Sequence, residues 1–174
     1  IEFEVKAGQA SPLVMQRRLH ALGQRTFNLM VDVTNYAMLE LAQPTHAFDG
    51  RRLSAIRVAP MGRPGVFTTL DGQERRMLAE DLLIWNEKEP VALAGIMGGL
   101  NSEVEDSTTK ILLESANFRA ARIRRTSVRL DLRTESAQRF EKGQPPVNAK
   151  LGIARILKLV EDAGAQPKVT SRFT

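Results

Sequence analysis

The pattern of apolar and polar positions predicts helices near both ends of the chain. Apolar residues recur at helical spacing across residues 12–22, with Ser11 as a suitable N-cap and Pro12 at the first helical position. Helical patterns also cover two later segments, residues 118–130 and 145–163. The second of these begins with a pair of prolines and is followed by a glycine, as helices often are.

Short strands are predicted at the start of the chain and through its middle. Alternating or short apolar runs bounded by turn residues lie at 1–6, 55–59, 66–70, 74–78, 82–85 and 91–94. Asp71-Gly72 is a strong signal for a hairpin turn. The segment 31–41 has a mixed pattern that favours a short helix, which Pro44 must end. Runs of strands between helices indicate an α+β fold.

Length and composition are those of one domain. The 174 residues are 43% hydrophobic, which is enough for an ordinary core, and residues 144–146 are at most a joint between two lobes. Without cysteine, neither a disulfide framework nor a thiolate metal site can form. No apolar run approaches the roughly 20 residues that cross a bilayer, so we expect no membrane contact and a cytoplasmic location. The strand-like start without Met predicts a fragment of a longer polypeptide.

The positive charge is concentrated in one segment. The net charge is +5, and residues 119–139 contain seven arginines against two acidic residues. Such a cluster is suited to binding nucleic-acid phosphates, with Arg124 and Arg125 as the candidate contacts. The alternative, which is the commoner use of helical arginines, is a solvated face or ion pairs with internal carboxylates.

Three groups of segments do not fit a purely structural role. The first, VDVTNY at 31–36 followed by QPTHAFD at 43–49, places polar residues among apolar ones, where they need partners. The second, ALAGIMGG at 92–99, leads a strand into glycines that permit close approach of the backbone to a ligand. The third comprises LESANF at 113–118 and RTESAQRFEKG at 133–143.

These segments, in this order, resemble the B3/B4 region of bacterial phenylalanyl-tRNA synthetase beta subunits. The resemblance spans residues 11–143 and implies a two-lobed domain with mixed or antiparallel sheets flanked by helices, covering 1–174 as part of a longer beta subunit. It also implies an activity, hydrolysis of tyrosine wrongly esterified to phenylalanine tRNA, in a cleft between the lobes. The implied partners are the tyrosine-bearing 3′ end of that tRNA, the rest of the beta subunit, and the alpha subunit of a heterotetramer. No metal or cofactor is implied in this domain, whereas the parent ligase would bind ATP and Mg elsewhere.

The resemblance assigns site roles to six residues. Thr34, Asn35 and His46 would hold the attacking water or the terminal ribose, and Gly95, Glu114 and Ser136 would bind the aminoacyl group. Glu114 is a natural acceptor for the phenolic hydroxyl of tyrosine, because a buried polar partner disfavours the analogue that lacks the hydroxyl. Without the resemblance, His46 reads as a structural loop histidine, Glu114 as an exposed strand residue, and Gly95 as part of a tight turn.

Departures from the family's usual runs leave the function open between classes. Ser136 stands where alanine is usual and Gln138 where histidine is usual, Lys142 replaces arginine, and Asn28-Leu29 replaces a pair of asparagines. The leading hypothesis is a hydrolytic editing domain acting within a synthetase. Its main rival is a non-catalytic module that binds tRNA or holds the assembly together, and a free-standing homologue is a third possibility.

Overall fold

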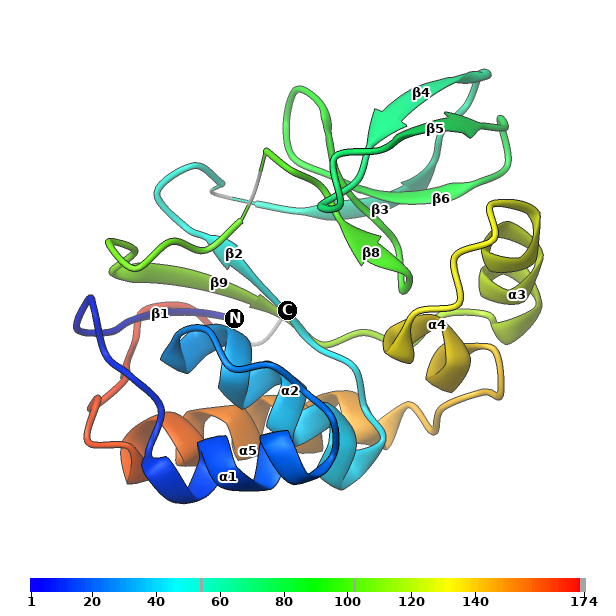
Figure 1. The fold of residues 1–174 in the computed structure, drawn as a ribbon. Helices are drawn as coiled ribbons and strands as arrows, with labels where there is room; N and C mark the ends of the chain where they lie inside the picture. Colours follow the sequence, from blue (N-terminus) through cyan, green and yellow to red (C-terminus); the bar gives the residue numbers. More distant parts are fainter. Residues whose placement is uncertain (54, 102, 173–174) are drawn as a thin grey trace. The chain divides into compact units, whose positions relative to one another are not determined.

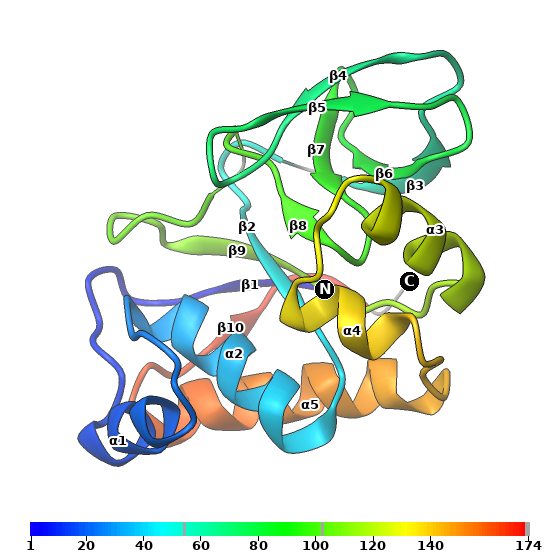
Figure 2. The same ribbon diagram turned by 45° about the vertical axis from the view of Figure 1, so that its right-hand side comes forward.

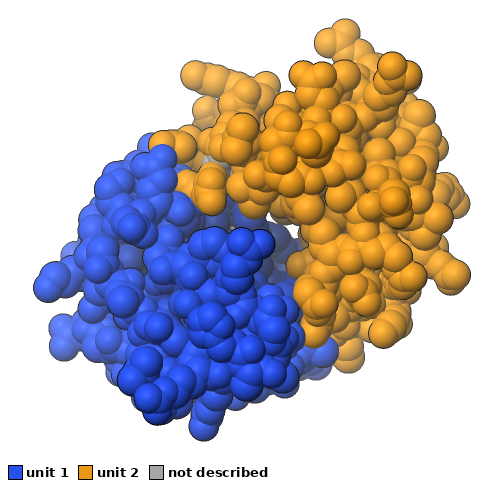
Figure 3. Space-filling model, viewed as in Figure 1, with its two compact units in different colours: residues 1–51, 104–116, 146–174 blue, residues 52–103, 117–145 orange. Residues whose placement is uncertain are grey.

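The computed structural model describes residues 1–53, 55–101 and 103–172, and the chain forms two compact units. Unit 1 comprises residues 1–51, 104–116 and 146–174, and unit 2 comprises residues 52–103 and 117–145 (Figure 3). The chain passes from unit 2 to unit 1 between Pro145 and Pro146. This is the joint that the sequence predicts.

Unit 1 is a sheet of four strands with helices on one face. The strand order is β10 (Lys168–Val169), β1 (Glu2–Glu4), β9 (Lys110–Glu114), β2 (His46–Asp49), and every pairing is antiparallel. The helices on this face are α1 (Leu13–Ala21), α2 (Leu29–Leu41) and α5 (Val147–Asp162) (Figures 1 and 2). The core lies between the two layers, where Phe3 and Ile111 of the sheet pack with Leu19, Val33 and Ile156 of the helices.

The helix α2 is longer than the short helix predicted, because its N-terminus is capped by a residue outside the apolar pattern. The side chain of Asn28 accepts a hydrogen bond from the amide of Val31 at 3.1 Å. The helix ends at Leu41, and its C-cap Ala42 adopts a left-handed conformation with φ 56°. Pro44 therefore lies two residues beyond the C-cap.

The N-cap predicted for α1 is wrong. Pro12, not Ser11, occupies the N-cap position, and no side chain caps this helix. The hydroxyl of Ser11 instead donates to the buried carboxylate of Asp32 at 2.5 Å, and Asp32 also accepts from the amide of Phe27 at 2.9 Å. Ser11 therefore pairs with a buried carboxylate far along the chain instead of capping the helix that follows it.

Unit 2 contains a four-stranded sheet, a separate hairpin and two helices. The sheet order is β3 (Arg57–Pro60), β6 (Leu82–Trp85), β7 (Pro90–Leu93), β8 (Met97–Gly98), and the hairpin pairs β4 (Gly65–Thr68) with β5 (Glu74–Met77). Both are antiparallel. The helices are α3 (Ala120–Arg129) and α4 (Glu135–Phe140).

In unit 2, the local sequence predicts the strands correctly where turn residues mark their ends. The Asp71-Gly72 turn is confirmed, with Gly72 at φ 74° between β4 and β5. The strand at 82–85 has the predicted bounds, whereas β3 begins two residues later than predicted. The α+β class is confirmed. None of the helices in the described part of the chain is long and apolar enough to cross a membrane.

Candidate functional site

His46 and Glu114 lie directly opposite each other on adjacent strands of unit 1. His46 is the first residue of β2, Glu114 is the last residue of β9, and the antiparallel register pairs the two. The next pair along, Ala47 and Leu113, belongs to the core under the helices. Because side chains alternate between the faces of a strand, His46 and Glu114 share the face of the sheet that points away from these helices.

Both side chains carry a buried polar atom with no hydrogen-bond partner among the described residues. These atoms are Nε2 of His46 and Oε1 of Glu114. The imidazole of His46 also meets the edge of the buried Phe48 ring, with centroids 4.4 Å apart. Buried polar atoms in proteins are nearly always paired, so an unpaired atom on each of two opposed residues makes this a candidate site for another molecule. His46 lies in a strand rather than in a loop, and Glu114 is half-buried rather than exposed.

The same environment controls the charge of both groups. Burial lowers the pKa of His46 to about 4, so its imidazole is neutral near pH 7. Burial raises the pKa of Glu114 to about 7, although the ammonium group of Ile1 and a hydrogen bond from the amide of Ala116 oppose the rise. A neutral imidazole can hold a water molecule, and a carboxyl group poised near neutrality can accept or donate a hydrogen bond.

The raised pKa of Glu114 predicts a pH-dependent effect on stability. The carboxyl group of Glu114 binds its proton more tightly in the folded state than in the unfolded state. Its contribution to the stability of the fold is therefore fully present below pH 4.5 and is lost as the pH rises through about 7. Glu114→Gln should therefore increase the free energy of unfolding at pH 8 by about 3 kcal/mol relative to the parent chain, and the difference should vanish towards pH 4.5. Chemical denaturation at a series of pH values measures this difference.

The buried His46 changes stability with pH in the opposite direction, but it does not affect the comparison between the parent chain and Glu114→Gln. Its lowered pKa gives stability above pH 6.5 that is lost as the pH falls through about 4. Because the parent and Glu114→Gln chains both keep His46, subtracting their free energies removes its effect. A difference that does not change between pH 4.5 and 8 would show that Glu114 is not held in a desolvated site.

Thr34 and Asn35 lie on α2 in the same unit. The helix packs against β2 and α5. The hydroxyl of Thr34 donates to the carbonyl of Val31 at 2.8 Å, which leaves its oxygen lone pairs to accept from another group. Both side chains are half-buried. The structure therefore places four of the six predicted site residues in unit 1.

Gly95 and Ser136 belong to unit 2, where a hydroxyl group connects their segments. Thr134 caps α4 by accepting from the amide of Ala137 at 3.1 Å, and its hydroxyl donates to the carbonyl of Ile96 at 2.7 Å. This bond ties the start of α4, which carries Ser136, to the residue after Gly95. Sequence reasoning did not identify Thr134, although threonine three residues before the next apolar position is a capping signal.

Gly95 has a structural reason to be glycine. Its φ is +67°, and a Cβ would lie 2.9 Å from Phe118, 3.0 Å from Phe140 and 3.2 Å from Ile123. These side chains are all buried, and the two phenylalanine rings pack edge to face. A side chain at Gly95 is thus excluded by both conformation and space. The turn and the packing of these side chains therefore explain the glycine by themselves.

Sequence reasoning also missed a group of polar atoms next to the His46–Glu114 pair. Within the described residues, the buried side-chain atoms without a hydrogen-bond partner include Gln43 Oε1, Thr45 Oγ1 and Ser115 Oγ. Thr45 precedes His46 in the chain and Ser115 follows Glu114. No local pattern could have revealed this group, because it is assembled from two segments some 70 residues apart in sequence.

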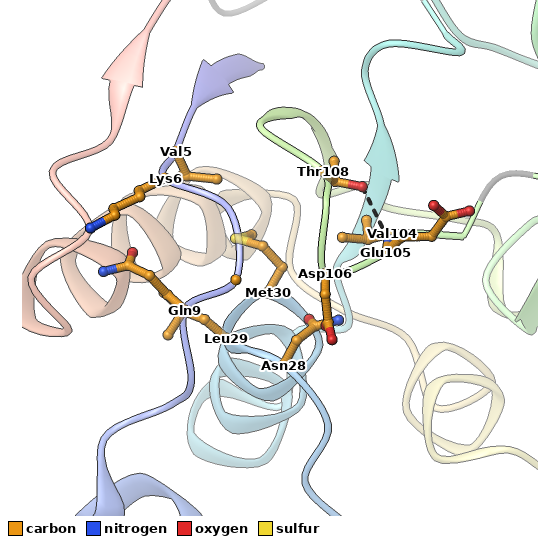
Figure 4. A pocket seen from close by; sticks show the side chains of 11 residues that line it. Val5, Lys6, Gln9, Asn28, Leu29, Met30, Val104, Glu105, Asp106 and Thr108 are labelled. Carbon is orange, nitrogen blue, oxygen red and sulfur yellow. Dashed lines mark hydrogen bonds between the residues drawn. The ribbon is translucent and has the colours of Figure 1, made fainter.

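A separate small pocket in unit 1 contains none of the six predicted residues. Its volume is about 20 Å³, room for about one water molecule, and Gln9, Met30 and Asp106 are among the residues that line it (Figure 4). The hydroxyl of Thr108 accepts from the amide of Glu105 at 3.0 Å at its edge. In the residues that the structure covers, no group of three or more His, Asp or Glu side chains is arranged to hold a metal ion.

The arginine-rich segment divides into paired and exposed residues. The guanidinium of Arg129 pairs with the buried Asp81 and donates to the carbonyl of Arg76 at 2.9 Å. Two further pairs join Arg133 to Glu141 and Arg139 to Glu135. The two predicted phosphate contacts, Arg124 and Arg125, are exposed on α3 and form no ion pair with any described residue. The internal-pairing interpretation therefore holds for the end of the segment but not for these two arginines.

The nucleic-acid-binding hypothesis predicts that removing the exposed arginines weakens tRNA binding without destabilising the fold. We expect the double change Arg124→Ala and Arg125→Ala to weaken binding about 3- to 10-fold and to reduce the slope of log K against log salt by about 1 to 2, because two phosphate contacts are lost. Titration with tRNA at several salt concentrations measures both quantities. Arg129→Ala is the matched control, since it should lower thermal stability by leaving Asp81 unpaired while the salt slope stays the same. An unchanged slope in the double variant contradicts the assignment.

The amino-acid sequence matches a known domain family over nearly its whole length. The model of the B3/4 domain family matches residues 3–165, nearly the whole chain. The chain therefore belongs to the B3/4 domain family.

The relatives of this chain are phenylalanine–tRNA ligase beta subunits. The chain is 55% identical to the beta subunit of Geobacter sulfurreducens over 135 residues, which is 76% of this chain and 17% of that protein. It is 46% identical to the Clostridium tetani subunit over 159 residues (90% and 20%), and 41% identical to the Streptomyces avermitilis subunit over 171 residues (94% and 20%). The chain thus spans about a fifth of the length of the curated relatives that it matches.

Proposed function

We propose that this domain hydrolyses the ester of tyrosine wrongly attached to phenylalanine tRNA, within a phenylalanine–tRNA ligase. The observation that carries the proposal is that His46 and Glu114 lie opposite each other on adjacent strands and that each has a buried polar atom, Nε2 and Oε1 respectively, without a hydrogen-bond partner among the described residues. The family membership supports it by supplying the class of substrate, since the relatives are named as ligase subunits for phenylalanine. Tyrosine is the near-isosteric amino acid that such a ligase must reject.

Glu114 recognises the substrate in this proposal. Its Oε1 accepts a hydrogen bond from the phenolic hydroxyl of tyrosine, and phenylalanine offers no donor to the same atom. A phenylalanyl ester would leave this buried acceptor without a hydrogen bond, and this free-energy cost lets the site discriminate by a single hydroxyl group. The family resemblance assigns Ser136 and Gly95 of unit 2 to the same substrate, Ser136 as a small side chain that leaves room for the ring and Gly95 through its backbone amides.

Hydrolysis then depends on holding one water molecule in place. The pKa of His46, lowered by burial to about 4, makes the imidazole too weak a base to ionise water strongly. Its neutral Nε2 is nevertheless free to hold a water molecule. Thr34 and Asn35, to which the resemblance gives the same role, lie on α2 at the other face of the sheet, so this step rests on His46. Catalysis by such groups comes mainly from orientation of the water towards the ester carbon. No metal or cofactor takes part in this scheme.

The test is hydrolysis of tyrosyl-tRNA by the ligase that carries this domain. The editing proposal expects release of tyrosine far faster than release of phenylalanine from the same tRNA, both measured with isolated aminoacyl-tRNA so that synthesis does not interfere. Equal and slow release of both amino acids, with tRNA binding retained, would favour the non-catalytic binding module.

A further inference from the structure

The segments that carry His46 and Glu114 meet the helix α5 at a glycine. Gly152 lies in the middle of α5, where glycine weakens a helix and alanine would be preferred. A Cβ at this position would lie 2.9 Å from Ser115 Oγ, 3.1 Å from Gln43 Cγ and 3.3 Å from Thr45 Cγ2. Three side chains from two separate segments therefore converge on one point of the helix.

The contacting residues are next to the proposed site in the chain. Thr45 immediately precedes His46, and Ser115 immediately follows Glu114. Because neighbouring residues of a strand point to opposite faces, Thr45 and Ser115 face α5 while the pair faces the other way. Displacement of Thr45 or Ser115 away from the helix would carry His46 or Glu114 with it.

Gln43 makes this contact rigid. Its side chain is fully buried, and its Nε2 donates to the carbonyl of Pro44 and to the carbonyl of Ala116, both at 2.9 Å. The second bond crosses from the segment before β2 to the segment after β9. The two segments are thus joined to each other and cannot move independently when the helix presses on them.

We propose that Gly152 is a positioning residue for the His46–Glu114 pair, setting the distance between α5 and the ends of β2 and β9. The missing Cβ lets Ser115, Gln43 and Thr45 lie directly against the helix backbone. The proposal rests on the editing function for its kinetic test, but its structural content concerns only the placement of the two side chains.

Gly152→Ala is the direct test. In the ligase that carries this domain, it should lower kcat for hydrolysis of tyrosyl-tRNA about 10-fold, because a small displacement of the reacting groups slows a reaction that depends on their orientation. KM should change less than about 2-fold, and aminoacylation should be unaffected. Leu151→Ala, at the exposed neighbouring position of the same helix, is the matched control and should keep parental hydrolysis.

A second-site change separates positioning from general damage. Ser115→Ala removes the atom nearest to the added methyl group, so the double variant Gly152→Ala with Ser115→Ala should regain most of the lost rate. If Gly152→Ala does not fold, Ser115→Cys enlarges the same contact from the strand side and should lower kcat in the same way.

NMR titration of the 174-residue chain gives a readout that does not depend on activity. In Gly152→Ala, the pKa values of His46 and Glu114 should return towards those of exposed groups, since displacement admits water to the pair. Parental pKa values and a parental hydrolysis rate in folded Gly152→Ala would overturn the positioning role. If Glu114→Ala also leaves hydrolysis unchanged, the editing function fails instead, and the titration alone decides the role of Gly152.

Discussion

Replacing Glu114 by alanine in the ligase that carries this domain should reduce hydrolysis of tyrosyl-tRNA about 100-fold and leave aminoacylation with phenylalanine unchanged. In the proposed function, the change removes the buried acceptor for the phenolic hydroxyl, whose loss is worth up to about 3 kcal/mol in a shielded site. The preference for tyrosyl over phenylalanyl esters should fall with the rate. Misacylated tRNA should then accumulate during synthesis in the presence of tyrosine.

Two control variants make the Glu114 result specific. Glu114→Gln keeps the shape and one acceptor oxygen, so it should retain more discrimination than Glu114→Ala. Glu80→Ala removes an exposed carboxylate of unit 2 and should have no effect on either reaction. If Glu114→Ala hydrolyses both esters at parental rates, the carboxylate does not recognise the substrate.

Replacing Ser136 by tryptophan should abolish clearance of tyrosyl-tRNA, with a loss of at least about 100-fold. Ser136 is half-buried in the first turn of α4. In the role that the family resemblance gives this residue, an indole would fill the space that the tyrosine ring needs. Filling a binding pocket removes binding of the substrate and the transition state together, so kcat/KM should fall. Ser136→Ala restores the residue usual in the family and should leave clearance near the parental rate or improve it.

The fold of the tryptophan variant is checked by circular dichroism and by unaltered aminoacylation. Thr134, which caps α4 and bonds to the carbonyl of Ile96, is left in place in this variant. Parental clearance in both Ser136→Trp and Glu114→Ala would mean that the proposed pocket is wrong. The non-catalytic module would then be the better account of this domain.

The sequence predicted those elements that short-range signals specify. The turn at Asp71-Gly72, the strand at 82–85 and the long C-terminal helix all depend on residues within a few positions of one another. The sequence did not predict β2 or β9 as strands, because the bounds of these strands are set by their pairing with each other and by the pairing of β9 with β1. The extent of α2 was underestimated for a similar reason, because Asn28 lies outside the apolar repeat that marked the helix.

The candidate site likewise depends partly on local sequence and partly on contacts between segments that are far apart in the chain. By itself the sequence determined the family, since ordered motifs around His46, Gly95, Glu114 and Ser136 carry it, and the match to residues 3–165 confirms that assignment. Only the tertiary structure set His46 opposite Glu114, desolvated both, and divided the arginines into paired and exposed ones. Sequence motifs list which chemical groups are present. Strand register, burial and the one glycine on α5 decide which groups meet, and these depend on contacts between segments far apart in the chain.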